Sequence, residues 1–352
     1  MKILITGNMG YVGPGVVRQL RKAYAGAELV GVDCGFFAHC LSVPAVLPEI
    51  MLDRQYFCDV RQLPDEMLQN VDVIVYLAAI SNDPMGNLYE KPTRDINCRA
   101  AAELAARAKA AGAEVFVFAS SCSVYGFSEG YTCDEKAELN PLTAYARSKA
   151  MAEKELEGLA DKSFKVTCLR FATACGISER LRLDLVLNDF TASALAAGVI
   201  SILSDGTPWR PLINVRDMAR AVEWAIKRDM ADGGPFLAIN TGSDEWNYQV
   251  KELAYAVAEV FPGLEIYINN AAQQDKRSYR VDFGLYRRLA QGYQPQYSLD
   301  STIRELKAGL SKMGFKDKDF RQSDYIRLNV LNDLRNKGSI NENLEWVFRE
   351  RC

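Results

Sequence analysis

Two side chains in the run YARSK have the types and the spacing of an acid–base pair. Tyr145 and Lys149 are four residues apart, so on a helix they lie on the same face. A free tyrosine has a pKa near 10, and a base at neutral pH needs that value lowered by about three units, or about 4 kcal/mol. A nearby ammonium group favours the phenolate. The pair therefore predicts a phenol that takes a proton from a substrate hydroxyl.

A second segment, FASSCSVYG at residues 118–126, contains three serines, a cysteine and a tyrosine. Any of these hydroxyl or thiol groups is a candidate nucleophile. A serine hydroxyl close to the phenol would instead orient a substrate and stabilise a carbonyl as it forms. The segment by itself does not select among these roles.

The stretch ITGNMGYVG predicts a dinucleotide-binding turn. Gly7, Gly10 and Gly13 follow a predicted strand and begin a predicted helix, whose N-terminus presents free N–H groups to a pyrophosphate. Asp33 lies twenty residues beyond Gly13, at the end of the second predicted strand. A carboxylate there accepts hydrogen bonds from the ribose hydroxyls. Because no arginine adjoins Asp33 in the sequence, we expect NAD rather than NADP.

Residues at the ends of two further strands are expected to complete this site, because ligands lie at the carboxyl ends of a parallel sheet. The small side chains of Ala78 and Ala79 would let a flat cofactor approach closely. The predicted cofactor contacts are Gly7, Met9, Gly10, Tyr11, Val12, Gly13, Asp33, Asp59, Val60, Leu77, Ala78, Ala79, Tyr145 and Lys149.

Apolar strand-like runs alternate with helical stretches, which predicts an α/β fold with a doubly wound parallel (Rossmann) sheet. The predicted strands are Lys2–Thr6, Leu29–Asp33, Val71–Leu77, Glu114–Ala119 and Lys165–Phe171, and the predicted helices between them are Val12–Tyr24, Thr93–Ala111 and Leu142–Leu159. From about Cys175 the pattern loosens into a smaller, interwoven α/β lobe, with helices at Leu183–Ala197 and Gln249–Val260.

We accordingly predict an NAD-binding domain formed by residues 1–174 and about 211–243. The substrate lobe is predicted at about 175–210 and 244–352. It ends in a charged tail from Lys316, which we expect to be a solvated face.

Composition argues against several classes of partner. The 352-residue chain has a formal net charge of −3 and no basic stripe interleaved with aromatics, so no nucleic-acid partner is expected. No apolar run approaches the ~20 residues needed to cross a bilayer, and the amino terminus lacks a signal-peptide layout, so we expect a cytoplasmic protein without membrane association. The nine cysteines form no C-x-x-C pair and His39 is the single histidine, so no metal site is expected.

Taken together, these motifs resemble the extended short-chain dehydrogenase/reductase family, in particular nucleotide-sugar epimerases and dehydratases of the UDP-glucose 4-epimerase type. The matching residues are the glycine turn, Asp33, the Ser-Ser-x-x-Val-Tyr-Gly block at 120–126, the Tyr145–Lys149 pair and the segment 210–217. The resemblance implies that Ser121 orients the substrate, Tyr145 is the base and Lys149 lowers its pKa. Tyr76 departs from the pattern, since many members have histidine there.

The resemblance also implies a reaction. Related 4,6-dehydratases carry an Asp-Glu pair where this chain has Cys122 and Ser123, so dehydration is not expected. We predict an NAD-dependent nucleotide-sugar 4-epimerase that acts through a transient 4-keto sugar. An NAD-dependent 4-dehydrogenase or ketoreductase needs the same residues and stays an alternative. A non-catalytic NAD-sensing regulator is a remote one, because such proteins commonly lose the Tyr/Lys pair.

The substrate implied by the resemblance is a nucleoside-diphosphate sugar, whose diphosphate suits the forked donors of arginine. The predicted substrate contacts are Ser81, Ser123, Thr173, Arg182, Arg210, Asp275, Arg277 and Tyr279. Relatives usually pair the helices that correspond to 93–111 and 142–159 across a four-helix interface, so a homodimer is expected. The residues do not identify the nucleotide base or the sugar.

Overall fold

A computed structural model describes residues 1–42, 47–269, 271 and 277–347. Its centre is a seven-stranded parallel sheet in the order β11-β7-β5-β4-β1-β2-β3. The strands are β1 (Lys2–Thr6), β2 (Glu28–Asp33), β3 (Arg54–Phe57), β4 (Val73–Tyr76), β5 (Val115–Ser121), β7 (Lys165–Phe171) and β11 (Phe236–Thr241). The predicted fold class is therefore confirmed. The strand order reverses between β1 and β4, which is where such sheets bind ligands.

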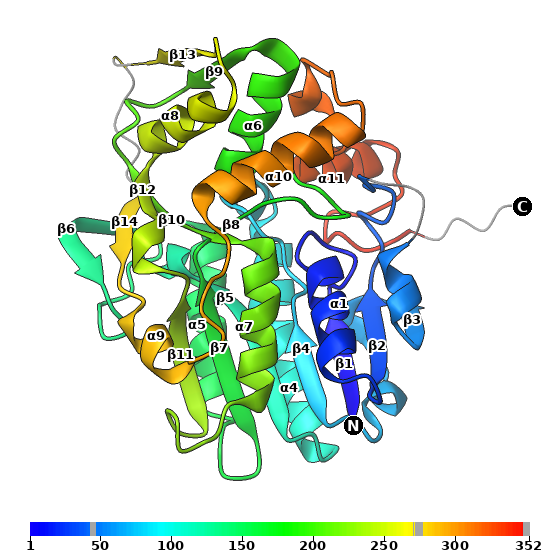
Figure 1. The fold of residues 1–352 in the computed structure, drawn as a ribbon. Helices are drawn as coiled ribbons and strands as arrows, with labels where there is room; N and C mark the ends of the chain where they lie inside the picture. The colour runs from blue at the N-terminus through cyan, green and yellow to red at the C-terminus, as the bar shows by residue number, and fades with distance from the viewer. Residues whose placement is uncertain (43–46, 270, 272–276, 348–352) are drawn as a thin grey trace, which may run out of the picture.

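Helices cover both faces of this sheet (Figure 1). Helices α1 (Gly13–Ala23) and α7 (Val215–Lys227) share a core with Ile3 and Ile5 of β1. Helices α4 (Ala100–Ala110) and α5 (Ala144–Glu157) share the opposite core with Leu4. Alternate residues of β1 thus serve opposite faces. All residues of β4 and β7 are buried. This burial explains the continuous apolar sequence of β4, whereas β7 also buries Lys165, Thr167 and Arg170.

The predicted helix at 93–111 contains a change of pitch that the sequence did not predict. It runs as α3 (Glu90–Arg94), a π-helical turn (Asp95–Arg99) and then α4. Within that turn Asn97 accepts a hydrogen bond from the main-chain N–H of Ile80 and donates to Ser148 on α5. The buried amide therefore links the loop after β4 to the helix that carries Tyr145.

A second lobe lies above the carboxyl ends of the central strands (Figure 1). It has its own core, to which α6, α8 and α10 contribute Leu187, Leu253 and Leu306. Its helices and short strands are β8 (Thr173–Cys175), α6 (Val186–Ala197), β9 (Val199–Ile202), β10 (Trp209–Asn214), β12 (Asn247–Gln249), α8 (Val250–Val260), β13 (Glu265–Ile268) and α10 (Leu299–Lys312). The strands β6 (Phe127–Cys133) and β14 (Ser278–Val281) pair at its margin. The remaining helices are α2 (Asp83–Leu88), α9 (Gly284–Leu289) and the tail helix α11 (Arg327–Asn336), which lies on the other side of the molecule from β6 (Figure 1).

The described part of the tail has an exposed charged face and a buried apolar one. Its charged residues are largely exposed, as expected for a solvated face. Leu331, Ile340 and Leu344 are buried in the same core as Leu4 of β1, so the tail packs onto the sheet domain through its apolar side chains.

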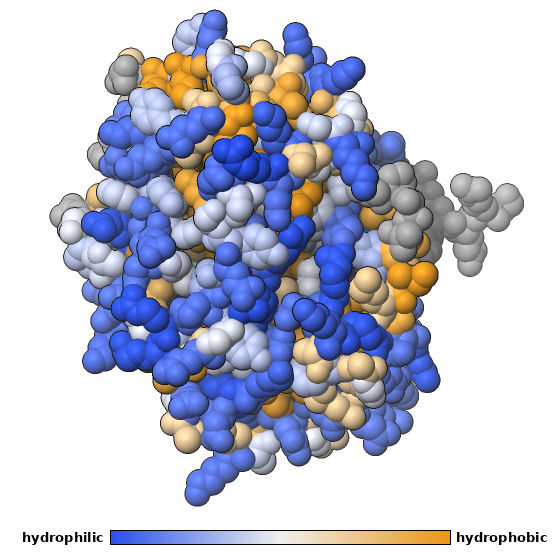
Figure 2. Space-filling view, in the orientation of Figure 1, coloured by the Kyte–Doolittle hydropathy of each residue, from blue (hydrophilic) through white to orange (hydrophobic). Residues whose placement is uncertain are grey.

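The face of the molecule drawn in Figure 2 is mostly hydrophilic, with hydrophobic residues gathered mainly over the upper lobe. Among the described residues, no helix combines the length and the apolar character needed to span a bilayer.

Candidate active site

The glycine turn lies where neighbouring backbone leaves no room for side chains. Gly7 adopts φ +73°, and a Cβ there would lie 2.5 Å from the main-chain nitrogen of Ala78, just after β4. A Cβ on Gly13 would lie 2.0 Å from the main-chain oxygen of Asn8. The N-cap of α1 is Val12, whose apolar side chain leaves the first-turn N–H groups to a ligand.

A cavity of about 150 Å³ lies beside this turn. The predicted cofactor contacts that line it are Gly7, Gly10, Tyr11, Val12, Asp33, Asp59, Val60, Leu77, Ala78 and Ala79. Tyr145 and Lys149 line the larger cavity described below and not this one. Met9 and Gly13 do not line it either; the N–H of Met9 donates to the Asp33 carboxylate over 3.0 Å, and Gly13 packs on Asn8. These two residues shape the turn instead. Glycines, small side chains and one carboxylate around a narrow cavity fit a dinucleotide.

Asp33 is held in place by main-chain donors. Its carboxylate accepts hydrogen bonds from the N–H groups of Gly35 (2.7 Å) and Met9 (3.0 Å). Burial raises the pKa of Asp33, and these bonds oppose that rise. The fold also brings Arg180 close enough to lower this pKa, although no arginine adjoins Asp33 in the sequence. Arg180 itself is paired with Glu49 over 2.6 Å.

A larger cavity of about 1010 Å³ separates the sheet from the second lobe. The two cavities share six lining residues, namely Tyr11, Val12, Leu77, Ala79, Ser81 and Arg182. A cofactor in the smaller cavity and a substrate in the larger one would therefore meet at this shared wall.

The three predicted catalytic residues line the larger cavity together. Ser121 is the last residue of β5, whereas Tyr145 and Lys149 lie one turn apart on α5. The Ser121 hydroxyl lies close enough to the Tyr145 phenol to lower its pKa. The ammonium of Lys149 donates to the main-chain oxygen of Ala119 over 2.7 Å and lies 5.9 Å from the centroid of the Tyr145 ring. The sequence spacing thus predicted a real cluster.

The electrostatics of this cluster differ from the sequence prediction. Burial raises the pKa of Tyr145 to about 12, while the nearby hydroxyl of Ser121 lowers it and the charge of Asp83 raises it further. Burial also lowers the pKa of Lys149 to about 7. In the protein by itself, Tyr145 is therefore a neutral phenol at pH 7 and Lys149 is only about half charged. The expected acidification of the phenol by this ammonium is not present in the chain alone.

The other polar residues of 118–126 have different surroundings. Cys122 is buried, its thiol lies 3.0 Å from the main-chain oxygen of Arg170, and burial raises its pKa well above the usual value, so it is not an accessible base. Tyr125 donates to Asn240 over 2.7 Å, which agrees with a structural role. Ser123 lines the larger cavity, and among the described residues its buried hydroxyl has no hydrogen-bond partner. That hydroxyl is open to a ligand.

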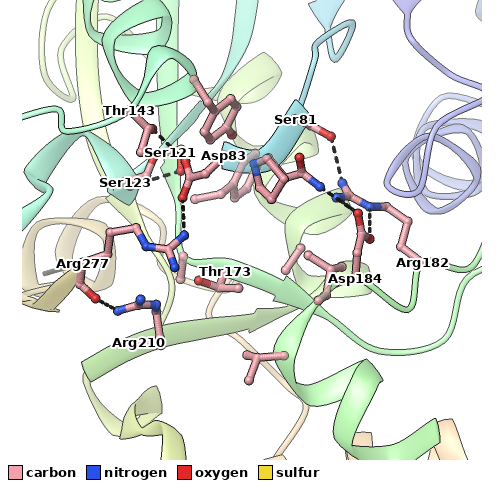
Figure 3. A pocket seen from close by; sticks show the side chains of 18 of the residues that line it. Ser81, Asp83, Ser121, Ser123, Thr143, Thr173, Arg182, Asp184, Arg210 and Arg277 are labelled. Carbon is pink, nitrogen blue, oxygen red and sulfur yellow. Dashed lines mark hydrogen bonds and ion pairs between the residues drawn. The ribbon is translucent and has the colours of Figure 1, made fainter. Parts of the chain in front are cut away.

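The three arginines predicted to bind substrate line this cavity, and two of them form ion pairs with carboxylates (Figure 3). Arg182 pairs with Asp184 over 2.9 Å and donates to Ser81 over 2.8 Å. Arg277 pairs with Asp83 over 2.9 Å, and Arg210 donates to the main-chain oxygen of Arg277.

Two more predicted substrate contacts, Thr173 and Tyr279, also line the larger cavity. The remaining one, Asp275, lies outside the described residues.

Comparisons with known proteins identify the family. A model of the "NAD dependent epimerase/dehydratase family" matches residues 3–240. The chain belongs to this family. The predicted resemblance is confirmed, and the protein is an NAD-dependent enzyme of the nucleotide-sugar epimerase/dehydratase type. Its predicted NAD cofactor is confirmed with it.

Its relatives include both epimerases and other enzymes. This family member is 28% identical over 249 residues to UDP-glucose 4-epimerase of Lactobacillus helveticus, covering 65% of this chain and 73% of the other. The structure of MoeE5 in complex with UDP-glucuronic acid and NAD aligns with TM-score 0.74 and 26% identity, covering 89% of this chain and 99% of MoeE5. TunA, an NAD-dependent NDP-hexosamine 5,6-dehydratase, aligns with TM-score 0.76 at 22% identity, covering 90% and 99%, and shares the fold.

Sequence reasoning missed two residues of this enzyme that line the cavities, Asp184 and Arg327. Asp184 follows Arg182 by two residues, so a neighbouring opposite charge was an available signal. Arg327 belongs to the tail helix and lines the smaller cavity with Asp33. No local pattern connects two residues so far apart in the chain.

Proposed function

We propose that this enzyme is a nucleoside-diphosphate-sugar 4-epimerase. The observation that carries the proposal is the cluster of Ser121, Tyr145 and Lys149 in the larger cavity, which shares part of its wall with the cavity beside the glycine turn. Cys122 and Ser123 stand where related dehydratases have two carboxylates, so the acid and base for elimination of water are missing from those positions. Hydride and proton exchange at one sugar carbon is the chemistry that these residues support.

In this mechanism Tyr145 takes the proton of the sugar C4 hydroxyl and later returns it to the 4-keto oxygen. Ser121 donates a hydrogen bond to that oxygen as the carbonyl forms, which stabilises the developing charge. Bound NAD, held at the glycine turn and Asp33, would supply the acceptor and donor of the C4 hydride, and the positive charge of its oxidised ring would favour a phenolate. Bringing the pKa of Tyr145 from about 12 to neutrality corresponds to about 7 kcal/mol of preferential stabilisation of the phenolate.

The larger cavity supports a diphosphate sugar as the substrate. Arg210 and Arg277 lie together on its wall, and their guanidinium groups suit phosphate oxygens. Close to Ser121 in the chain, the hydroxyl of Ser123 has no hydrogen-bond partner among the described residues. A diphosphate held by the two arginines would leave the sugar within reach of Tyr145.

The alternative is a 4-dehydrogenase or ketoreductase on the same substrate class, since it uses the same residues. Incubating the purified enzyme with a panel of nucleotide sugars separates the two. A 4-epimerase gives a stereoisomer without net NADH, whereas a dehydrogenase consumes NAD in proportion to product. A product that lacks the elements of water would contradict both.

We also propose that the enzyme forms a homodimer through α4 and α5, because relatives usually pair the corresponding helices. These helices lie together on one face of the sheet, and Met151 of α5 is an exposed apolar side chain there. Light scattering that shows only monomers at micromolar concentration would contradict this assembly.

A further inference from the structure

The C-terminal segment returns from the second lobe to the loops that border the cofactor cavity (Figure 1). The indole N–H of Trp346 donates to the main-chain oxygen of Cys34 over 2.7 Å, directly after Asp33. Arg61, which follows β3, donates to the main-chain oxygens of Asn343 (2.7 Å) and Leu344 (3.1 Å). The tail is thereby attached to the ends of β2 and β3.

Within this segment, Arg327 reaches the cavity itself. It begins α11, is 1% exposed, and lines the smaller cavity with Gly7, Gly10 and Asp33. Its guanidinium donates to the main-chain oxygens of Arg180, Leu181 and Asp324 over 3.0 to 3.1 Å. Among the described residues, no carboxylate forms an ion pair with it.

The other buried arginines of the described chain either have a carboxylate partner or lie away from the two cavities. Arg170, Arg180 and Arg182 are each paired with a carboxylate at 2.6 to 2.9 Å. Arg228 has no such pair within the described residues, but it lines neither cavity and is surrounded by backbone oxygens. Arg327 alone among these five buried arginines combines a cavity position with the lack of a carboxylate partner in the described chain.

A buried cation is costly unless an anion accompanies it. Burial lowers the pKa of Arg327 to about 10, so the guanidinium is still charged at neutral pH. It lies 4.9 Å from the centroid of the Phe37 ring, which lines the same cavity. Of the five N–H groups of Arg327, three donate to backbone oxygens, and the remaining two can donate to phosphate oxygens.

We propose that Arg327 is a cofactor-binding residue that pairs with a phosphate of the dinucleotide, so that the tail helps to retain NAD in its cavity. The inference rests on NAD as the cofactor and not on 4-epimerisation. Tight binding of NAD is useful in any reaction in which the same cofactor molecule takes a hydride from the substrate and later returns it. The tail, read in the sequence as a solvated face, thus has a binding role.

Titration calorimetry with ADP and with adenosine tests the phosphate contact without any sugar substrate. We expect Arg327→Met to weaken ADP binding by about 10- to 100-fold while leaving adenosine binding unchanged, because only ADP carries the phosphates. Arg327→Lys keeps the charge and should recover part of the ADP affinity. Arg335→Met, on the exposed side of the same helix, serves as the control and should bind both ligands as the wild type does. An equal loss for ADP and adenosine, or no loss for ADP, overturns the proposal.

The unmodified protein supplies a second measurement in case Arg327→Met does not fold. Hydrogen exchange of peptides that cover residues 324–336 should slow more with saturating ADP than with saturating adenosine. Equal protection by the two ligands would overturn the proposal. The outcome does not depend on turnover, so failure here is distinct from failure of the proposed 4-epimerase activity.

Discussion

The two walls of the active cavity are built in different ways. The wall formed by the sheet domain consists of tight backbone and small residues, as at Gly7, where a Cβ would lie 2.5 Å from the nitrogen of Ala78. The opposite wall consists of long charged side chains in ion pairs, as in Arg182 with Asp184 and Arg277 with Asp83. The first wall thus offers main-chain groups and close contact to a ligand, whereas the second offers charged side chains that already have partners.

This difference indicates how each wall meets its ligand. The sheet wall is already shaped for a flat, anionic dinucleotide by glycines and helix N–H groups. On the lobe wall, Arg182 and Arg277 already have carboxylate partners, so an incoming diphosphate must compete with those carboxylates or join them. Specificity for the sugar nucleotide should therefore depend on how each ion pair rearranges. Four experiments distinguish the walls, in order of decreasing expected effect.

Replacing Tyr145 by phenylalanine tests the sheet wall as the catalytic one. The variant keeps the ring but has no proton acceptor, so kcat should fall by about 10²- to 10⁴-fold. NAD affinity should stay close to that of the wild type, because the cofactor cavity is untouched. Steady-state kinetics and NAD titration measure the two effects. Turnover equal to the wild type would refute the proposed mechanism.

Asp184→Asn tests the ion pairs of the lobe wall. The change leaves the buried Arg182 without its charged partner, and breaking such a pair should cost about 3–5 kcal/mol in the free energy of unfolding. Urea denaturation measures this cost. Asp300→Asn, which removes an exposed pair with Arg304, is the matched control and should cost less than about 1 kcal/mol. Similar costs for both variants would show that the lobe pair has no special stability.

Gly7→Ala tests the close approach on the sheet wall. The positive φ and the overlap with Ala78 should destabilise the fold by about 1–3 kcal/mol and weaken NAD binding. Gly26→Ala is the control, since no atom of the described residues lies within 4 Å of its added Cβ. Thermal unfolding with and without NAD measures both effects. If the two alanine variants have the same stability and the same response to NAD, the turn tolerates a side chain, which would contradict the close approach described for the sheet wall.

The smallest expected effect concerns Lys149. Burial lowers the pKa of its ammonium group from 10.5 to about 7. Between pH 7 and 9 the unfolded chain binds more protons at this site than the folded protein, so the free energy of unfolding should rise with pH by about 1 kcal/mol per unit. Lys149→Met removes this contribution. Lys154→Met, exposed on the same helix, should keep the wild-type slope. Parallel pH profiles for the wild type and Lys149→Met would contradict the burial effect.

Much of the sheet domain could be predicted because its signals are local. The alternation of apolar runs and helices predicted the central strands, and the spacing of Tyr145 and Lys149 predicted two side chains on one helical face. Element ends were less accurate: the helix expected from Leu183 begins at Val186, and the one expected from Thr93 is helical from Glu90. Neither N-cap residue, Leu185 or Tyr89, makes a side-chain cap hydrogen bond, so no capping residue marked these ends in the sequence.

The sequence by itself determined the parallel sheet, the glycine turn for NAD and the Tyr145–Lys149 pair, because each has a signal in the pattern of residue types along a short stretch of chain. Only the tertiary structure decided the pKa of Tyr145, the pairing of Arg277 with Asp83, and the return of the tail that brings Arg327 to the cofactor cavity. Burial and charge pairing depend on which distant segments pack together, and no short stretch of sequence encodes that.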